Sequence, residues 1–210
     1  MAARTATPAS RLTTMVRLLL VLNIAIYLLQ GVAGDTLIDL FALWPPVAPP
    51  AGEVAPGFMP WQMVTYSFLH GGPLHLAVNM LALWMFGRAI EDVLGSRRFA
   101  LHYLASVVTA AATQMLVATV AGEVYPTVGA SGGVFGLLLA FGLFFPRQRI
   151  WLLLPPIPMP AWLFVTLYAL VELVLGVTGT QAGVAHFAHL GGMLGSYLML
   201  RHFARAGPRR

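Results

Sequence analysis

The stretch Ser131-Gly-Gly-Val-Phe-Gly-Leu-Leu-Leu-Ala-Phe-Gly-Leu-Phe-Phe145 decides how this chain folds. Every residue after Ser131 is apolar or glycine, and Pro146 and Arg147 follow directly. Such a run predicts a buried helix that ends at a polar boundary. Its 15 residues would form a helix of roughly 22 Å at 1.5 Å per residue. Crossing about 30 Å of hydrocarbon takes about 20 residues, so this helix is too short to span a bilayer alone.

The shortness of this segment predicts that Ser131 lies below the membrane surface. If Pro146 lies at one face of the bilayer, the other end of the helix stops roughly 8 Å short of the opposite hydrocarbon surface. Residues 122–130 then dip inward to reach it. Irregular backbone at that depth is tolerated only where it is buried in protein or lines a wet cavity. We therefore expect a water-accessible cavity with Ser131 on its floor.

Apolar runs on both sides of this segment indicate a protein solvated by lipid. Hydrophobic residues make up 59% of the 210 residues and charged residues only 9%, with a mean hydropathy of +0.80. Soluble domains carry about 25% charged residues. We therefore predict an all-α, polytopic membrane protein of six transmembrane helices, at 18–33, 74–90, 99–121, 131–146, 161–177 and 184–200.

The basic residues predict the topology. All twelve are arginine, and the connectors 34–60, 121–130 and 178–183 contain none of them. By the positive-inside rule both termini are then cytoplasmic, and Ser131 opens to the non-cytoplasmic face. The membrane domain would cover residues 18–203, between a cytoplasmic segment 1–17 and an Arg-rich cytoplasmic tail 204–210. The arginines are scattered in short clusters between the apolar runs, which argues against nucleic-acid binding despite the net charge of +5.

Two further features bound the cellular setting. The first apolar run is preceded by arginines and followed by the small residues Ala33 and Gly34, so a cleaved signal peptide is an alternative to a first span. The chain has no cysteine, which excludes disulfides and thiolate metal sites. Basic residues that are all arginine, with a minimal six-span core, predict a prokaryotic plasma membrane.

The residues around Ser131 suit nucleophilic catalysis. The segment Gly129-Ala130-Ser131-Gly132-Gly133 joins a serine to a helix start, whose unpaired N–H groups can stabilise an oxyanion. Glycines let a substrate backbone approach closely. The structural alternative is that Ser131 simply caps its helix and that Gly132 belongs to a small-residue packing face.

His189, in the sixth run, is the candidate base. A histidine inside a membrane span faces a cavity or a partner, and imidazole is the usual base for a serine. Small neighbours would let its helix approach the one that carries Ser131: Ala188, Gly191, Gly192, Gly195 and Ser196. The alternative is a structural hydrogen bond between helices.

Other polar residues inside the runs have two interpretations each. His75 and Asn79 are four residues apart, so they share a helix face and can donate either to an oxyanion or to a neighbouring helix. His186 is three residues before His189, near the same face. These imidazoles with His70 have the chemistry of a zinc site, but no H-E-x-x-H motif or neighbouring carboxylate supports one. We expect neither a metal nor a cofactor.

Together these motifs resemble the rhomboid family of intramembrane serine proteases, in order and spacing as well as in residue type. The resemblance covers nearly the whole chain and implies a six-helix rhomboid-like bundle. It lies in the pair Trp61-Gln62, the stretch His70-Gly-Gly-Pro-Leu-His-Leu-Ala-Val-Asn-Met80, the positions Gly87, Glu91 and Leu94-Gly95-Ser96, the motif Gly129-Ala-Ser-Gly132, and Ala188-His-Leu-Gly-Gly192.

The resemblance implies roles for these residues. Ser131 attacks the scissile carbonyl and His189 removes its proton. The backbone N–H of Ser131, with His75 and Asn79, holds the oxyanion. The implied substrates are single-span membrane proteins that enter from the bilayer past the second and fifth helices, and the residues expected to bind substrate or pack beside the dyad are Gly129, Gly132, Phe135 and His186.

The family uses a dyad without a carboxylate, so we expect no acidic residue to orient His189. Glu172, inside the fifth run, is interpreted as a structural partner between helices rather than a triad member. Two departures from the family pattern leave the dyad intact: Gln62 stands where an arginine is common, and Phe135 stands where a tyrosine stacks on the histidine. Phenylalanine can still stack.

Two rival functions are open at this point. A non-catalytic relative that escorts membrane clients would be expected to lack Ser131 or His189, and this chain keeps both. A small transporter or channel would explain intramembrane His and Glu, but the sequence has no inverted repeat. The sequence predicts neither the natural substrate nor the oligomeric state.

Overall fold

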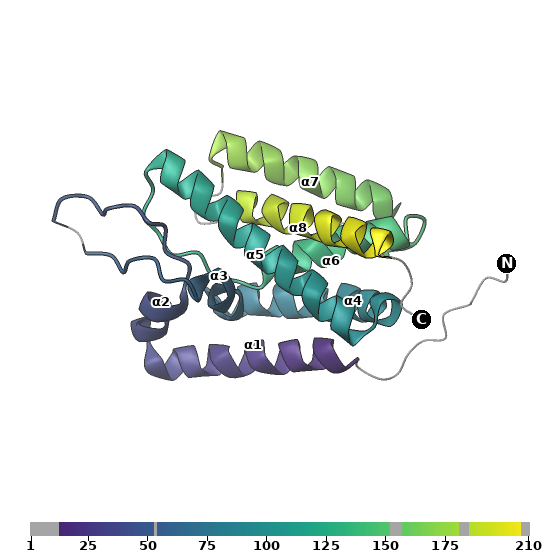
Figure 1. Cartoon of the computed structure of the whole chain (residues 1–210), viewed down its shortest axis with the longest axis horizontal. Helices are drawn as coiled ribbons and strands as arrows, with labels where there is room; N and C mark the ends of the chain where they lie inside the picture. The colour runs from purple at the N-terminus through teal and green to yellow at the C-terminus, as the bar shows by residue number, and fades with distance from the viewer. Residues whose placement is uncertain (1–12, 53, 152–156, 181–184, 207–210) are drawn as a thin grey trace.

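The computed structural model describes residues 13–52, 54–151, 157–180 and 185–206 (Figure 1). In these residues six long helices occur where the six apolar runs predict them: α1 (Thr14–Ala33), α4 (Pro73–Leu94), α5 (Ser96–Ala121), α6 (Ser131–Phe144), α7 (Ala161–Thr178) and α8 (His186–Arg205). The shorter elements are α2 (Asp35–Phe41), α3 (Gln62–Thr65), the 3-10 helix η1 (Tyr66–Phe68) and the antiparallel strands β1 (Arg149–Trp151) and β2 (Pro158–Pro160). The predicted all-α class is confirmed.

Local sequence explains how α4 is bounded. Pro73 occupies its first turn, where a missing N–H leaves no helical hydrogen bond unmade. At the other end α4 meets α5 at Gly95, whose φ of 75° is a left-handed conformation that glycine adopts without strain. The chain therefore turns between two long helices with a single residue.

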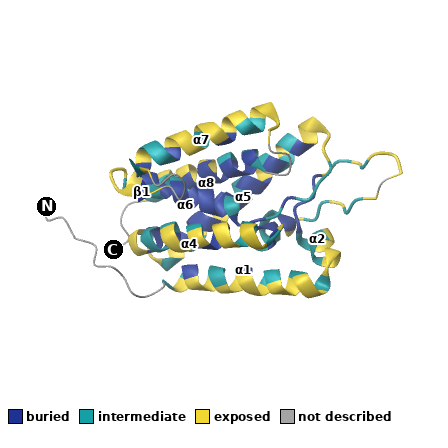
Figure 2. Cartoon of the chain, turned by 180° about the vertical axis from the view of Figure 1, so that it is seen from behind, coloured by how far each residue is buried: buried dark blue, intermediate teal, exposed yellow. Residues whose placement is uncertain are grey.

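Helix α6 lies at the centre of the molecule, in contact with α4, α5, α7 and α8, and Figure 2 shows buried residues concentrated there. A helix that is apolar all round belongs in such a position. Glycines set the spacing: a Cβ atom on Gly192 of α8 would overlap the carbonyl oxygen of Gly132, and one on Gly136 would overlap Ser106 of α5. The close approach of the sixth run to the fourth is confirmed.

Figure 2 shows that the outer faces of the long helices are exposed, and many of the exposed side chains are large and apolar. In the described residues, α1, α4, α5 and α7 are each long and apolar enough to cross a membrane, and α6 is shorter, as predicted. Val32 of α1 is 86% exposed and Val177 of α7 is 71% exposed, and both helices carry several other large apolar side chains that are exposed. Soluble monomers rarely expose such continuous apolar surface. The chain is a multi-pass membrane protein.

The described arginines gather at one end of this bundle. Arg17 is in the first turn of α1, Arg97 begins α5, and Arg205 ends α8, and Figure 1 shows these helix ends together. Four arginines lie outside the described residues: Arg4, Arg11, Arg209 and Arg210. Most of the predicted segments 1–17 and 204–210 is likewise outside the described residues. Which side of the membrane this end faces stays a prediction.

Glu91 fastens the start of α1 to the corner between α4 and α5. Its two carboxylate oxygens accept the backbone N–H groups of Met15 (3.0 Å) and Val16 (2.9 Å), and Ser96 donates to it at 2.5 Å. The first N–H groups of a helix have no partner inside it. Glu91 therefore supplies the cap that Thr13, the residue before α1, does not provide.

The segment 34–60, rich in proline and glycine, begins with the short helix α2, which the sequence did not predict. Gln62, at the family's common arginine position, is fully buried and accepts hydrogen bonds from the backbone N–H groups of Trp44 (3.3 Å) and Met59 (3.2 Å). The Trp61 indole donates to the carbonyl of Leu40 at 2.9 Å. The pair Trp61-Gln62 thus anchors this segment to the bundle.

Candidate active site

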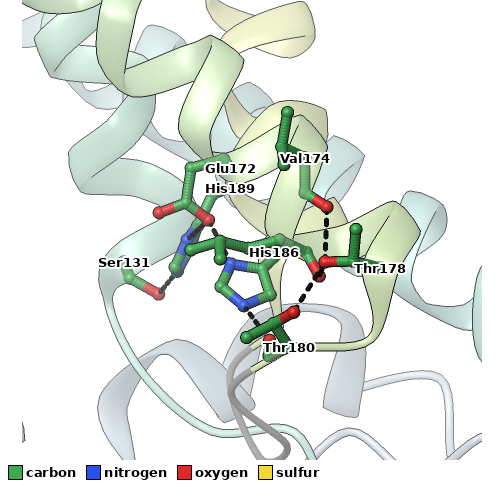
Figure 3. A network of polar contacts seen from close by, with 8 residues as sticks. Ser131, Glu172, Val174, Thr178, Thr180, His186 and His189 are labelled. Carbon is green, nitrogen blue, oxygen red and sulfur yellow. Dashed lines mark hydrogen bonds and ion pairs between the residues drawn. The ribbon is translucent and has the colours of Figure 1, made fainter.

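Ser131 is the first residue of α6, and its side chain does not cap the helix. The N-cap is Ala130, and no side-chain hydrogen bond caps the helix there. Instead the Oγ atom of Ser131 lies 2.9 Å from Nε2 of His189 (Figure 3). The capping interpretation of Ser131 is therefore wrong. The two residues predicted as nucleophile and base are 58 positions apart in sequence and are brought into hydrogen-bond contact.

The ring of His189 is fixed by an aromatic stack. Phe135 lies one helical turn after Ser131, and its ring is 4.1 Å from the His189 ring at an interplanar angle of 3°. The predicted stacking by phenylalanine is confirmed. Face-to-face contact at this distance holds the plane of the imidazole, so that its Nε2 edge points along α6 toward Ser131.

Glu172 of α7 contacts His189, which corrects the expectation that no acidic residue is placed to orient this ring. Its Oε2 atom lies 2.8 Å from Nδ1 of His189 (Figure 3). Glu172 is only 4% exposed. It does join α7 to α8, as an interhelical partner would, but the link runs through the imidazole. Sequence spacing did not reveal this because it does not fix the rotation of α7 about its axis.

His186 contacts the same carboxylate oxygen. Its Nδ1 atom lies 2.6 Å from Oε2 of Glu172, and its Nε2 atom is 3.3 Å from the carbonyl oxygen of Thr180. The prediction that His186 and His189 share one face of their helix is confirmed, because both rings reach one oxygen atom. Figure 3 shows the resulting chain of polar contacts from Ser131 to the end of α7.

His75 lies beside Gly129 and close to Ser131. The backbone N–H of Gly71 donates to its Nδ1 atom at 3.3 Å, so the ring proton is on Nε2. A Cβ atom on Gly129 would lie 2.8 Å from Nε2 of His75 and 3.7 Å from Oγ of Ser131. Gly129 has a φ of 128°, which favours glycine. Because Gly129 has no side chain, the space between Nε2 of His75 and Oγ of Ser131 stays open.

Asn79 shares the face of His75 but is not hydrogen-bonded to Ser131. It is buried, and its Nδ2 atom donates to the backbone carbonyl of His75 at 2.9 Å. Among the described residues it makes no hydrogen bond to Ser131. An amide nitrogen carries two N–H groups, so one donor of Asn79 is not used by this contact.

Gly132 is a packing residue in this structure. A Cβ atom there would overlap the side chain of Ala110 and lie 3.1 Å from the Tyr66 hydroxyl. Tyr66, which the sequence did not single out, donates to the carbonyl of Val107 at 2.9 Å, and its own carbonyl accepts the N–H of Gly129 at 3.0 Å. It thus fixes the loop before α6 to α5.

The end of the loop before α6 is buried in protein, as irregular backbone at membrane depth requires. Thr127 pairs with Leu43 through two backbone hydrogen bonds of 3.0 and 2.9 Å. Thr127, Gly129 and Ala130 are all buried. Backbone groups that a membrane would leave without partners are therefore satisfied by the segment that follows α2.

His70 was not predicted to be buried, yet it is 2% exposed and packs behind His75 with ring centres 5.2 Å apart. Within the described residues neither of its ring nitrogens has a hydrogen-bond partner. Burial, with the neighbouring His75 as a smaller cause, lowers the pKa of His70 to about 4. Its backbone is held by Gln30, which accepts the N–H of His70 at 2.9 Å. His70 is therefore neutral at physiological pH.

A cavity of about 740 Å³ adjoins this network on the side of His186. Its walls are the ends of α5 and α7, the start of α8 and the loop after α5. Ser131 is not among its lining residues, so this cavity reaches the site through His186 rather than with the serine on its floor. Among the described residues, the polar ones that line it are Gln114, Glu123, Tyr125, Thr180 and His186.

Three side chains of types that can ligate a metal converge at His189, and they are not the predicted set of four histidines. Donor atoms of Glu172, His186 and His189 lie within 4.8 Å of one another. The oxygen–nitrogen distances of 2.6 and 2.8 Å are those of hydrogen bonds. Two ligands held at about 2.1 Å by tetrahedral zinc would be roughly 3.4 Å apart. The arrangement is thus a hydrogen-bonded carboxylate.

Comparison with known proteins decides the family. The model of the rhomboid domain matches residues 57–206, which is most of the chain and includes the contact between Ser131 and His189. The chain belongs to the rhomboid family. The resemblance found in the sequence motifs is confirmed.

The relatives of this rhomboid come from distant organisms. It is 34% identical over 137 residues to rhomboid protein 1, mitochondrial, of Saccharomyces cerevisiae, covering 61% of this chain and 37% of the relative. It is 33% identical over 137 residues to rhomboid protease GluP of Bacillus subtilis, covering 65% and 25%. It is 33% identical over 166 residues to RHOMBOID-like protein 4 of Arabidopsis thaliana, covering 74% and 40%.

The matched region spans a quarter to two fifths of the length of these three relatives. Their names place one in mitochondria and call one a protease. The prokaryotic plasma membrane expected from the sequence therefore stays a prediction.

Proposed function

We propose that this rhomboid is an intramembrane serine endopeptidase that hydrolyses peptide bonds in or near transmembrane segments of membrane proteins. The observation that carries the proposal is the 2.9 Å contact between Oγ of Ser131 and Nε2 of His189, at the centre of an apolar, lipid-facing bundle. A serine hydroxyl in direct contact with an imidazole is the arrangement that activates the oxygen as a nucleophile. The protease name of one relative agrees with it.

In the proposed reaction the Oγ atom of Ser131 attacks the scissile carbonyl carbon and its proton passes to Nε2 of His189. The tetrahedral oxyanion is stabilised by the backbone N–H of Ser131 at the start of α6, where helix N–H groups lack partners. Nε2–H of His75 and the second amide N–H of Asn79 are the further donors. His189 then protonates the leaving amine, and a water deprotonated by His189 releases the acyl group from Ser131.

The membrane setting of the site supports a particular class of substrate. A transmembrane helix protects its peptide bonds with its own hydrogen bonds, so it must unwind before a carbonyl can reach Ser131. We expect single-span substrates with helix-weakening glycine or proline near a cut beside a small side chain. They would enter from the bilayer between α4 and α7, with both termini of this rhomboid cytoplasmic and the site open to the opposite face.

The test uses the full chain purified in detergent and a single-span model substrate. Cleavage and labelling by a fluorophosphonate probe are expected in the wild type and absent in Ser131→Ala. Thr166→Ala is the matched control, because it removes an exposed hydroxyl that is bonded within α7. Cleavage that survives Ser131→Ala would contradict the proposal. A failure both to cleave any substrate and to label Ser131 would favour a non-catalytic escort instead.

A further inference from the structure

The carboxylate on the far side of the base has no role in a dyad mechanism. Oε2 of Glu172 is 2.8 Å from Nδ1 of His189, on the ring edge opposite to the contact with Ser131. Both residues are buried, and they come from different helices, α7 and α8. The carboxylate, the imidazole and the hydroxyl are thus linked in series.

This contact determines where the imidazole carries its proton. An ionised carboxylate can only accept hydrogen bonds, so Nδ1 of His189 is the nitrogen that donates to Glu172. Nε2 is then left with its lone pair toward the hydroxyl of Ser131, as a general base requires. Without Glu172, a neutral ring is free to hold its proton on Nε2, where it cannot accept the proton of the serine.

The carboxylate is itself held in place. The same oxygen is 2.6 Å from Nδ1 of His186, whose other nitrogen faces the carbonyl oxygen of Thr180 at 3.3 Å. Oε2 is therefore fixed from two helical positions, three residues apart on α8. With the Phe135 ring stacked on His189, the imidazole is constrained at both edges and on one face.

We propose that Glu172 is a positioning residue of the active site, so that this rhomboid works with a Ser131–His189–Glu172 triad in which His186 fixes the carboxylate. The inference rests on the proposed protease function and deepens it. When the proton of Ser131 moves to Nε2 of His189, the imidazolium keeps its Nδ1 proton and pairs with the carboxylate, which stays ionised throughout. The alternative is a carboxylate that only joins α7 to α8.

The first measurement is kinetic. Glu172→Gln is expected to lower kcat by about 10²-fold, because its amide can present N–H to Nδ1 and favour the wrong tautomer, with KM changed less than about twofold. Glu172→Asp keeps the charge and is expected to recover part of the loss. The matched control is Glu91→Gln, which alters a buried carboxylate bonded to backbone far from the dyad. It is expected to lower thermal stability and leave kcat unchanged.

The second measurement reads the tautomer directly. Nitrogen NMR of histidine-labelled protein, with His189 assigned by His189→Asn, is expected to show an Nδ1–H tautomer in the wild type and in Glu91→Gln. In Glu172→Gln the Nε2–H form is expected to appear. His186→Asn, whose amide can still donate to Glu172, should keep the wild-type pattern, whereas His186→Phe should reduce kcat several-fold.

The outcomes separate the two proposals. If Glu172→Gln loses thermal stability but keeps both kcat and the tautomer, the residue only links helices and this inference is overturned. Activity that a chelator abolishes and a divalent metal restores would overturn it too, since the three donors would then hold an ion. If the wild type neither cleaves nor labels at Ser131, the proposed protease function fails first, whatever Glu172 does.

Discussion

Two pairs of histidines lie near Ser131, and they differ in what surrounds them. His186 and His189 share one carboxylate oxygen of Glu172, at 2.6 and 2.8 Å. His70 and His75 pack edge to face at 5.2 Å and have no carboxylate between them. The partner of His75 is a backbone N–H, and in the described residues the ring nitrogens of His70 have no hydrogen-bond partner.

In the proposed mechanism this difference lets one residue type serve both as base and as oxyanion donor. An imidazole that donates to a carboxylate is oriented to accept a second proton, since the charge it gains has a counter-ion beside it. An imidazole that accepts from a backbone N–H and packs against another ring stays neutral and presents Nε2–H as a donor. In the proposed mechanism the position of Glu172 therefore separates the base, His189, from the oxyanion donor, His75.

The largest expected effect that tests this comparison is at His75. Replacing it with phenylalanine keeps an aromatic ring and removes the donor, and kcat is expected to fall by about 10²-fold with little change in KM, as for loss of one oxyanion donor. His75→Gln is expected to recover part of the loss, because its amide nitrogen can occupy the place of Nε2. Unchanged kcat in His75→Phe would mean that the reaction does not need a donor from the pair of His70 and His75.

An intermediate effect is expected from Gly129→Ala. A Cβ atom there would lie 2.8 Å from Nε2 of His75, so the imidazole must move away from Ser131, and kcat is expected to drop roughly tenfold. The control is Gly122→Ala, which also has a positive φ (69°) but nothing within 4 Å of the added atom. Both variants should lose about 1 kcal/mol of stability from backbone strain. Equal kcat values in Gly129→Ala and Gly122→Ala would show that the reaction does not depend on the position of the His75 imidazole.

The smallest effect is the pH dependence of stability caused by His70. Its pKa is lowered to about 4 by burial, from an ordinary value of 6.5. As the pH falls below 6.5 the unfolded chain takes up a proton there and the folded chain does not, so stability that is complete above 6.5 is lost down to pH 4. In His70→Phe this loss of Tm should be smaller by roughly 2–4 °C. His202→Phe, at an exposed position on α8, is the control, and identical curves for His70→Phe and wild type would contradict the assignment.

The sequence predicted the features that depend on local composition. Long apolar runs are helices whatever packs against them, and the glycines beside Ser131 and His189 made close packing of their helices predictable. The stack of Phe135 on His189 followed from the family resemblance. Each of these features depends on a few neighbouring residues or on a motif shared with the family, and each is confirmed.

The sequence could not predict contacts that depend on how one helix is rotated against another. Glu172 faces the base because α7 turns that side inward, and no spacing within α7 reveals it. The burial of His70 depends on packing against His75 and on Gln30, 40 residues earlier. Asn79 donates within its own helix, a choice that no pattern fixes. Residues 181–183 of the predicted connector 178–183 lie outside the described part of the chain.

The clamp made by Glu91 has a consequence for the order in which the chain is assembled. Two backbone N–H groups at the start of α1 find their acceptor 75 and 76 residues later in the chain. During synthesis α1 is therefore made before the acceptor of these two N–H groups, and water must accept their hydrogen bonds until α4 is in place. Ser96, which also donates to Glu91, is the first residue of α5. The first helix is finished as a structural unit only when the third long helix has begun.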